Sequence, residues 1–302
     1  MLVVAGPTGA GKSALALALA QKFAGEIVNC DSLQLYRQLD IGTAKPSLQE
    51  RQTVPHHLFD VLSLPEGFSA GEFGQMARPV IQQIAQRGHL PIVAGGTGFY
   101  LKALLDGLPV LPTKDNGLRA RLMMREQKRP GALHRLLRRL DAKSAPQIHF
   151  RDIQKLLRAL EVRILTGRPR AEAQTSAPLE NFRTLKIGLD PDRGQLRTRL
   201  EARTKRMFNG GLVDEVRSLL NSGATGNEKP FESLGYKQAL QHVRGAIMLE
   251  QAIESTLIET RQYAKRQRTW FRRDPEFKWL TGFGDSAETL DEGVALVEEW
   301  LG

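Results

Sequence analysis

This 302-residue sequence has a single cysteine, Cys30, and few aromatic residues, 6% of the chain. One cysteine excludes a disulfide framework and a metal site built from cysteines alone. The apolar runs are short, such as Leu2–Ala5 and Ile92–Ala94, and none approaches the ~20 residues that span a bilayer. The first residues also lack the charged leader of a secretory signal. We therefore expect a cytoplasmic protein with no membrane partner.

Acidic residues are scarce in two stretches of the chain. Residues 117–170 hold 15 Lys/Arg and 4 Asp/Glu, a local charge of +11 that exceeds the +10 of the whole sequence. Residues 261–273 hold six basic residues and no acidic one. A single basic run is most often a solvated helix face, but two separate runs favour a polyanionic partner such as nucleic acid.

Short apolar runs alternate with helical patterns in the first hundred residues. Helix-forming residues dominate 14–23 and 69–86. Strands are expected at Leu2–Ala5, Glu26–Cys30, His57–Leu62, Pro91–Ala94 and Leu185–Asp190. This alternation predicts an α/β fold with a parallel sheet flanked by helices.

The pattern changes after Pro112. Leucines follow helical spacing at Leu133, Leu136, Leu137 and Leu140, and again from Leu156 to Ile164, with no strand between. We predict an all-helical insertion domain at 113–179 that grips RNA, within an α/β core made of 1–112 and 180–302. From residue 190 onwards the chain is expected to be mostly helical.

A glycine-rich segment follows the first strand and opens the first helix. It consists of Gly6, Pro7, Thr8, Gly9, Ala10, Gly11, Lys12 and Ser13. Glycines let backbone N–H groups surround a phosphate, and the helix adds its positive N-terminal end. Lys12 supplies a cation to the phosphate oxygens, and the Ser13 hydroxyl can bind Mg²⁺. The predicted fold is therefore a P-loop NTPase-like one.

The second expected metal ligand of a nucleotide hydrolase is missing. The strand at Ile92–Ala94 runs into Gly95-Gly96-Thr97, where a hydrolase usually has an aspartate. The first carboxylate at a strand end is Asp31, which can act as a base, bind metal or cap a helix. An ATPase motor is thus disfavoured, whereas a small kinase or a transferase with a diphosphate leaving group remains.

Several longer motifs make the sequence resemble the tRNA dimethylallyltransferases, in their bacterial form. They are the glycine-rich loop, Asp31–Tyr36, Asp40–Pro46, Gly95–Tyr100 with Arg119–Arg121, Gln154–Glu161, Leu234–Gln238 and Thr260–Arg272. The match runs in order along nearly the whole chain. The family transfers a dimethylallyl group from dimethylallyl diphosphate to the N6 amine of the adenosine 3′ of the anticodon, at tRNA position 37.

The resemblance implies roles for individual residues. The loop would bind the diphosphate with Mg²⁺ near Ser13, and Lys12, Thr8 and Arg203 would stabilise it as it leaves. Asp31 would take the proton of the adenine amine. The enzyme would act as a monomer.

The resemblance also implies a path for tRNA, along which the target adenosine is flipped out. The tRNA-binding residues would be Asp31, Ser32, Leu33, Gln34, Thr97, Arg119, Gln154, Lys155, Leu156, Leu157, Arg158, Ser233, Leu234, Gly235, Tyr236, Lys237, Gln238, Lys265, Arg266, Gln267, Arg268, Thr269, Trp270, Phe271 and Arg272. Read without the resemblance, 265–272 could be an exposed basic helix and Tyr236 a core residue.

Two other classes of function stay open on the residues alone. A small kinase would share the phosphate loop but gives no reason for the basic insertion. A non-catalytic RNA-binding protein would not need Lys12, Ser13 and Asp31 together. Transfer of labelled dimethylallyl diphosphate to tRNA separates these alternatives.

Overall fold

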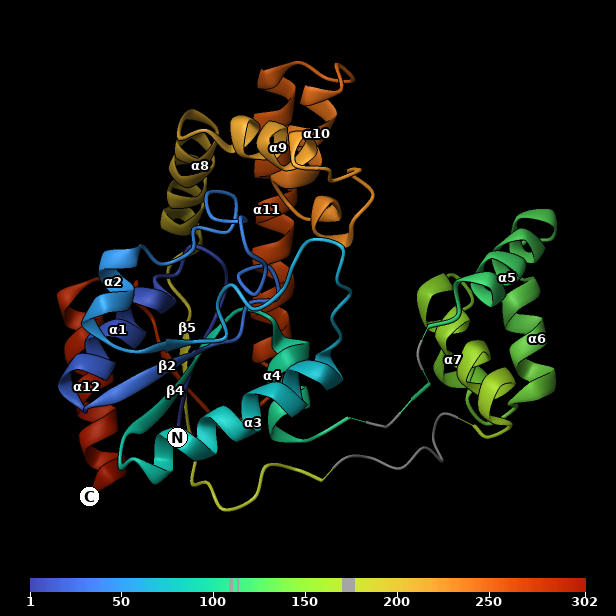
Figure 1. Ribbon diagram of the computed structural model, residues 1–302. Coiled ribbons are helices and arrows are strands. Elements are labelled where there is room, and N and C mark those ends of the chain that lie inside the picture. Colours follow the sequence, from blue (N-terminus) through green and yellow to red (C-terminus); the bar gives the residue numbers. More distant parts are fainter. Residues whose placement is uncertain (109–110, 113, 170–176) are drawn as a thin grey trace. The chain divides into compact units, whose positions relative to one another are not determined.

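The computed structural model describes residues 1–108, 111–112, 114–169 and 177–302. The chain forms two compact units, one made of Met1–Leu105 with Leu179–Gly302 and the other of Asp106–Pro178 (Figure 1). The expected insertion began at Thr113 and included 170–176, which lie outside the described residues. Within the described part, no helix is long and apolar enough to cross a membrane.

The first unit is built on one parallel sheet in its described residues. The strand order is β3-β2-β4-β1-β5-β6. The strands are β1 (Leu2–Ala5), β2 (Gly25–Asn29), β3 (His56–His57), β4 (Leu90–Gly95), β5 (Leu185–Leu189) and β6 (Phe277–Leu280). In register, Val4 lies beside Ala94 on β4 and beside Ile187 on β5. The loops that follow β1, β2 and β4 therefore leave the same edge of the sheet at its centre.

Helices cover both faces of this sheet, because successive strand side chains point to opposite sides. Leu2 and Val4 pack in a cluster with residues of α1 (Lys12–Lys22) and α12 (Ala287–Leu301). Val3 instead lies with Leu101 and Phe271, which belong to α4 (Gly98–Leu105) and α11 (Leu249–Phe271). On that second side, α3 (Ala70–Gln86) packs against α4 (Figure 1). The predicted α/β layering is thus confirmed.

A further set of helices in this unit lies at the top of Figure 1. They are α8 (Arg193–Asn209), α9 (Leu212–Asn221), the short 3₁₀ helix η3 (Lys229–Glu232) and α10 (Tyr236–Val243). Helix α11 contacts both α8 and α10 and then runs down to α4. It thereby connects the helical group to the edge where the strands end.

Two strand predictions were wrong. The strand expected at His57–Leu62 is reduced to β3, because Leu58 and Asp60 have φ of 63° and 56°, which breaks an extended chain. Strand β6 lies in a region expected to be helical. A short helix, α2 (Leu48–Thr53), also went unpredicted, although Ser47 and Glu50 form a capping box at its start.

The second unit is helical in its described residues. It contains α5 (Asn116–Lys128), α6 (Ala132–Leu140), the 3₁₀ turn η1 (Ala145–Gln147) and α7 (Ile153–Thr166). Leu133, Leu137 and Leu160 are fully buried where these helices meet. Leu140 and Ile164, expected on the same buried faces, are exposed because each lies near the end of its helix.

A buried carboxylate ties together three basic side chains near the start of β2 and β4. Glu26 is 3% exposed and bonds His57 Nε2 and His89 Nδ1 at 2.6 Å each, and Arg87 Nη2 at 2.8 Å. Burial alone would raise the pKa of Glu26, but hydrogen bonds from Arg87, His57 and His89 lower it to about 2. The negative charge of Glu26 therefore stabilises the fold.

We expect this cluster to make stability pH-dependent at acid pH. Because the folded pKa of Glu26 lies below its ordinary 4.5, its contribution is complete above pH 4.5 and is lost as pH falls towards 2. The contribution is about 2 kcal/mol, since one pKa unit is worth ~1.4 kcal/mol and the partly exposed partners are screened by water. Urea unfolding of wild type and Glu26→Gln at pH 3 and pH 6 measures it. The difference should be larger at pH 6, and equal differences would contradict the assignment.

Candidate functional site

The glycine-rich loop joins β1 to α1 as the sequence predicts. Gly11 is the N-cap of α1 with φ +88°, and a Cβ there would lie 2.7 Å from the backbone nitrogen of Gly284. The backbone N–H of Gly284 donates to Ala10 O at 2.8 Å. The turn after β6 therefore packs directly against the loop, and residue 11 must be glycine for both its conformation and this close approach.

Lys12 begins α1 and folds back over the loop. Its Nζ donates to Pro7 O at 2.9 Å. Burial lowers the pKa of Lys12 from 10.5 to about 8, a shift that the charge of Asp31 opposes and that of Arg203 reinforces. The Lys12 ammonium is thus held in the loop, where an anion would stabilise its charged form.

Arg203, Thr8 and Asp31 meet at this position from three parts of the chain. Arg203 on α8 donates from Nη1 to Thr8 Oγ1 at 3.3 Å. Burial lowers the pKa of Arg203, and the charge of Asp31 opposes that shift. Two cations and one carboxylate therefore influence one another beside the phosphate loop, and the four residues expected to be catalytic lie together.

Asp31 lies just beyond β2 in a tightly bonded turn. Its Oδ1 accepts from Leu33 N–H at 3.0 Å, and its own N–H donates to Asn29 Oδ1 at 2.8 Å. The next N–H, of Ser32, donates to Thr97 Oγ1 at 3.2 Å, which links this turn to the end of β4. The turn orients the Asp31 carboxylate but leaves it partly exposed.

The side chain of Gln34 bonds to the backbone of its own loop. Its side-chain nitrogen donates to Thr43 O at 3.2 Å, whereas Leu33 is half-buried. The segment expected to contact tRNA here is therefore also a closed loop held by its own hydrogen bonds.

The basic segment of α11 divides into two faces. Lys265, Arg266 and Thr269 are exposed. Arg268 and Arg272 form ion pairs with Asp190, a buried carboxylate that follows β5, although Arg272, the C-cap of α11, is itself exposed. These two arginines therefore fix α11 to the sheet, a role that the basic pattern did not reveal.

The other residues of α11 that were expected to bind tRNA differ in their exposure. Phe271 is buried, whereas Trp270 is 40% exposed and meets Phe99 edge-on at 6.4 Å. Gln267 is buried, and its amide bonds Thr8 N–H and Gly96 O. Trp270 and Phe99 thus form an aromatic surface next to the strand ends, while Gln267 is part of the loop support.

The predicted segment 233–238 is largely internal. Tyr236 is fully buried, and its hydroxyl donates to Glu215 Oε1 at 2.5 Å. Gln238 is 1% exposed, and its Oε1 accepts from the N–H of buried Gly235 at 3.0 Å. Ser233 and Leu234 are half-buried and Lys237 is exposed, so the accessible side chains of this segment are these three.

In the helical unit, a carboxylate forms ion pairs with two arginines that were expected to bind tRNA. Glu161 is fully buried; it accepts from Arg119 at 3.0 and 3.1 Å and from Arg158 at 2.6 Å. Leu156 and Leu157 lie in the core of the unit, so their side chains are not available to RNA. Gln154 and Lys155 are exposed.

Comparisons with known proteins all point to one group. The IPP transferase family model matches residues 34–274. The chain is 56% identical to a tRNA dimethylallyltransferase of Solibacter usitatus, over 100% of this chain and 99% of that protein. It is 51% identical to one of Koribacter versatilis, over 99% and 98% of the two chains.

Solved structures agree with the sequences. A tRNA delta(2)-isopentenylpyrophosphate transferase of Staphylococcus epidermidis is similar with a TM-score of 0.71 and 34% identity, over 99% of this chain and 98% of that one. A eukaryotic dimethylallyltransferase, described as acting on tRNA, reaches a TM-score of 0.81 at 28% identity, over 100% of this chain and 79% of that one. The fold is therefore the P-loop NTPase-like fold of these proteins.

The lowered pKa of Lys12 predicts how an anion binds to the loop. Inorganic pyrophosphate favours charged Lys12, so its affinity should fall as pH rises above about 8, by up to tenfold per pH unit. Calorimetric titration from pH 7 to pH 9.5 measures this. Lys12→Met should bind weakly at every pH and lose that part of the pH dependence. The same decline in Lys12→Met as in wild type would contradict the assignment.

Proposed function

This chain belongs to the IPP transferase family of tRNA dimethylallyltransferases, and we propose that its donor is dimethylallyl diphosphate and its acceptor the N6 amine of adenosine 37. Transfer of a dimethylallyl group to tRNA is the activity of this chain. The observation that best supports the finer proposal is the convergence of Lys12, Arg203 and Asp31 beside the phosphate loop. The monomeric state and cytoplasmic location stay predictions.

The phosphate loop and its two cations would act on the leaving group. In the reaction, the bond between C1 of the dimethylallyl group and the diphosphate oxygen breaks, and negative charge grows on that oxygen. Lys12 and Arg203 are half-buried cations that the fold holds beside the loop, so they stabilise this charge more than they would in solution. The Thr8 hydroxyl, which accepts from Arg203, adds a donor of its own to the diphosphate.

Asp31 would act on the nucleophile. The N6 nitrogen forms a bond to C1 as the bond from C1 to the diphosphate oxygen breaks. One proton of the amine passes to the Asp31 carboxylate. An aromatic amine is a weak nucleophile, so a fixed proton acceptor lowers the barrier. The hydrogen bonds of the Asp31 turn hold the carboxylate oriented while it stays accessible.

The residues near the loop suit a magnesium ion that is held mainly by the diphosphate. Ser13 lies in the first turn of α1 with an exposed side chain, and among the described residues no cluster of three His, Cys, Asp or Glu forms a metal cage. Mg²⁺ commonly binds through one or two protein ligands, substrate phosphates and water. When bound at Ser13, it would supply further positive charge to the leaving group.

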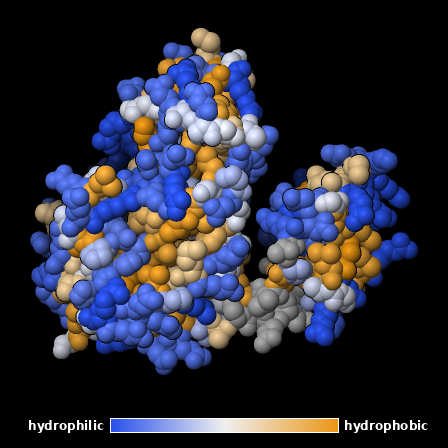
Figure 2. Space-filling model, viewed as in Figure 1, coloured by the Kyte–Doolittle hydropathy of each residue, from blue (hydrophilic) through white to orange (hydrophobic). Residues whose placement is uncertain are grey.

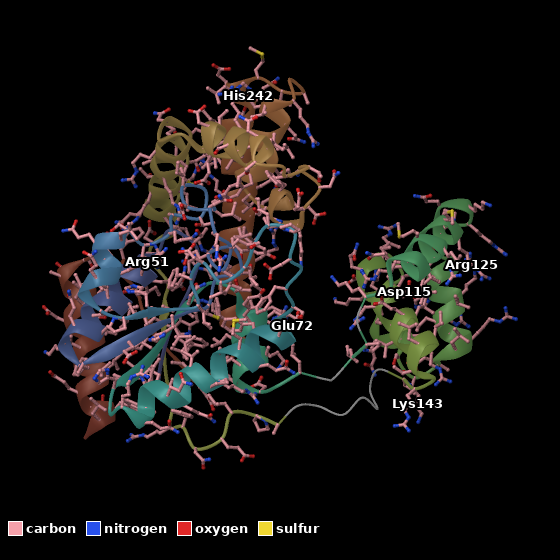
Figure 3. The ribbon with its side chains drawn as sticks, in the orientation of Figure 1. Arg51, Glu72, Asp115, Arg125, Lys143 and His242 are labelled. Atoms are coloured by element: carbon pink, nitrogen blue, oxygen red, sulfur yellow. The ribbon has the colours of Figure 1, made fainter. Side chains whose placement is uncertain are left out.

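Exposed cations of the helical unit would bind the tRNA backbone. Arg135, Arg138 and Arg139 on α6 are exposed, whereas Arg119 and Arg158 are both paired with Glu161. Figure 3 shows Arg125 and Lys143 extending outward from the same unit. In Figure 2 the surface of these helices is hydrophilic around one hydrophobic patch that faces the viewer. This charge accounts for a polyanion partner, which a small-molecule kinase would not need.

Removal of Asp31 should slow the chemical step selectively. We expect Asp31→Ala to lower the single-turnover rate of transfer by about 10²–10⁴-fold, as is typical when a general base is lost. Affinity for tRNA should stay close to that of wild type. Asp31→Asn is the matched isostere, because it can keep the bond to Leu33 N–H but carries no charge. A normal rate in either variant would exclude Asp31 as the base.

Removal of three exposed arginines should weaken the salt dependence of tRNA binding. Each duplex phosphate neutralised contributes about −0.9 to the slope of log affinity against log salt. The variant with Arg135, Arg138 and Arg139 changed to Gln should flatten this slope and raise the KM for tRNA, with pyrophosphate affinity unchanged.

The matched control removes the same charge from the first unit. Lys205, Arg217 and Lys278 are exposed and lie outside the predicted tRNA path. Changing these three to Gln should leave the slope nearer to the wild-type value. Equal slopes for all three proteins, each folded by circular dichroism, would mean that the α6 arginines do not bind tRNA.

A further inference from the structure

We propose that Gln267 is a positioning residue that holds the phosphate loop and the turn of Asp31 in one fixed relation. Its Oε1 accepts from Thr8 N–H at 2.8 Å, and its Nε2 donates to Gly96 O at 2.8 Å. One side chain of α11 therefore joins the loop after β1 to the end of β4. We call these two bonds the Gln267 bridge. Its role in transfer rests on the function proposed above.

The direction of the amide is determined by its partners. Thr8 presents an N–H and Gly96 presents a carbonyl, so a flipped amide would place donor against donor and acceptor against acceptor. The side chain is only 6% exposed, so water does not readily replace a lost partner. The bridge consequently has one stable arrangement.

The Gln267 bridge needs a residue without a side chain at position 96, which is Gly96. A Cβ at this position would lie 2.2 Å from Gln267 Nε2, and 3.6 Å from Lys12 Nζ. The first distance is far too short for a real contact, whereas the second is ordinary van der Waals contact. An added methyl would therefore displace the amide of Gln267 before it disturbed Lys12.

The bridge acts on both halves of the candidate site. On one side, Thr8 accepts from Arg203, which belongs to the leaving-group side. On the other, Thr97 follows Gly96; its Oγ1 accepts from Ser32 N–H at 3.2 Å and its N–H donates to Cys30 O at 3.2 Å. In the chain, Asp31 lies between Cys30 and Ser32, the two residues that Thr97 bonds. Gln267 thus fixes the distance between the diphosphate cradle and the proton acceptor without touching either reacting group.

This arrangement accounts for glutamine at a position expected to bind tRNA. Because the amide is buried and bonded at its oxygen to Thr8 and at its nitrogen to Gly96, RNA has little access to it. Loss of the bridge should consequently appear in the rate of transfer and in pyrophosphate affinity, and not in tRNA affinity.

The first experiment compares Gln267→Met with Gln262→Met. Gln262 lies on the same helix but is exposed, so it controls for the substitution itself. Gln267→Met should lower the single-turnover rate by about 10- to 100-fold, because small misplacements of reacting groups have effects of that size. Its tRNA affinity should match wild type, and its pyrophosphate affinity should fall. A normal rate and normal pyrophosphate affinity in a folded Gln267→Met would overturn the proposal.

A second experiment uses the close contact at Gly96. Gly96→Ala should reproduce the defect of Gln267→Met. In a Gln267→Ala background, where no amide remains to be displaced, adding Gly96→Ala should change the rate by less than about twofold, as expected for residues that act through one interaction. Effects that multiply independently would overturn the bridge. Pyrophosphate binding tests the bridge separately from transfer, so a wild type without transfer activity would overturn the proposed function alone.

Discussion

The site depends on the position of β4 between β2 and β1 in the parallel sheet. This order brings together, at one edge, the phosphate loop after β1, the Asp31 turn after β2 and the Gly95–Thr97 segment after β4. Parallel strands collect their carboxyl ends in this way because every connection crosses back over a face of the sheet. The glycine-rich loop and the Asp31 turn are thereby adjacent, although 17 residues separate Ser13 from Asp31 in sequence.

Burial gives this edge its electrostatic character. The charged form of Lys12 is only weakly stabilised, because burial lowers its pKa to about 8. An arriving anion can therefore pair with Lys12 without first displacing a tightly bound carboxylate. Elsewhere the fold does the opposite and pairs its arginines with buried carboxylates. Asp190 takes up Arg268 and Arg272, and Glu161 takes up Arg119 and Arg158. The surplus of positive charge in the sequence is therefore not all available to RNA.

The fold, and the positions of the glycine-rich loop and Asp31 at strand ends, could be predicted from the sequence because they depend on local patterns. The glycine spacing of residues 6–13, with a strand before it and a helix after it, requires only neighbouring residues to be recognised. Asp31 was placed by the same logic, as the first carboxylate at a strand end. Strand β6 was missed because four residues carry too little periodicity, and its place in the sheet comes from pairing with β5.

The roles of side chains on α11 could not be read in the same way. Lys265, Arg268 and Arg272 look alike in sequence, and only the distant Asp190 makes two of them structural. Gln267 carries no charge and belongs to no motif of its own, and its two partners are 259 and 171 residues away. Contacts over such separations are set by tertiary packing, which a single sequence does not display.

The junction of the helical insertion has a consequence for how the chain is assembled. Leu179 N–H donates to Leu105 O at 2.8 Å, so the main chain leaves the α/β unit and returns to it at adjacent points. The entropy of closing a long loop grows only slowly with its length, so residues 106–178 can be added at little thermodynamic cost to the host sheet. Each unit keeps its own hydrophobic core. The protein is in this sense modular: an α/β sheet could acquire a basic helical appendage, or vary it from one lineage to another, without rebuilding the loops at its own strand ends.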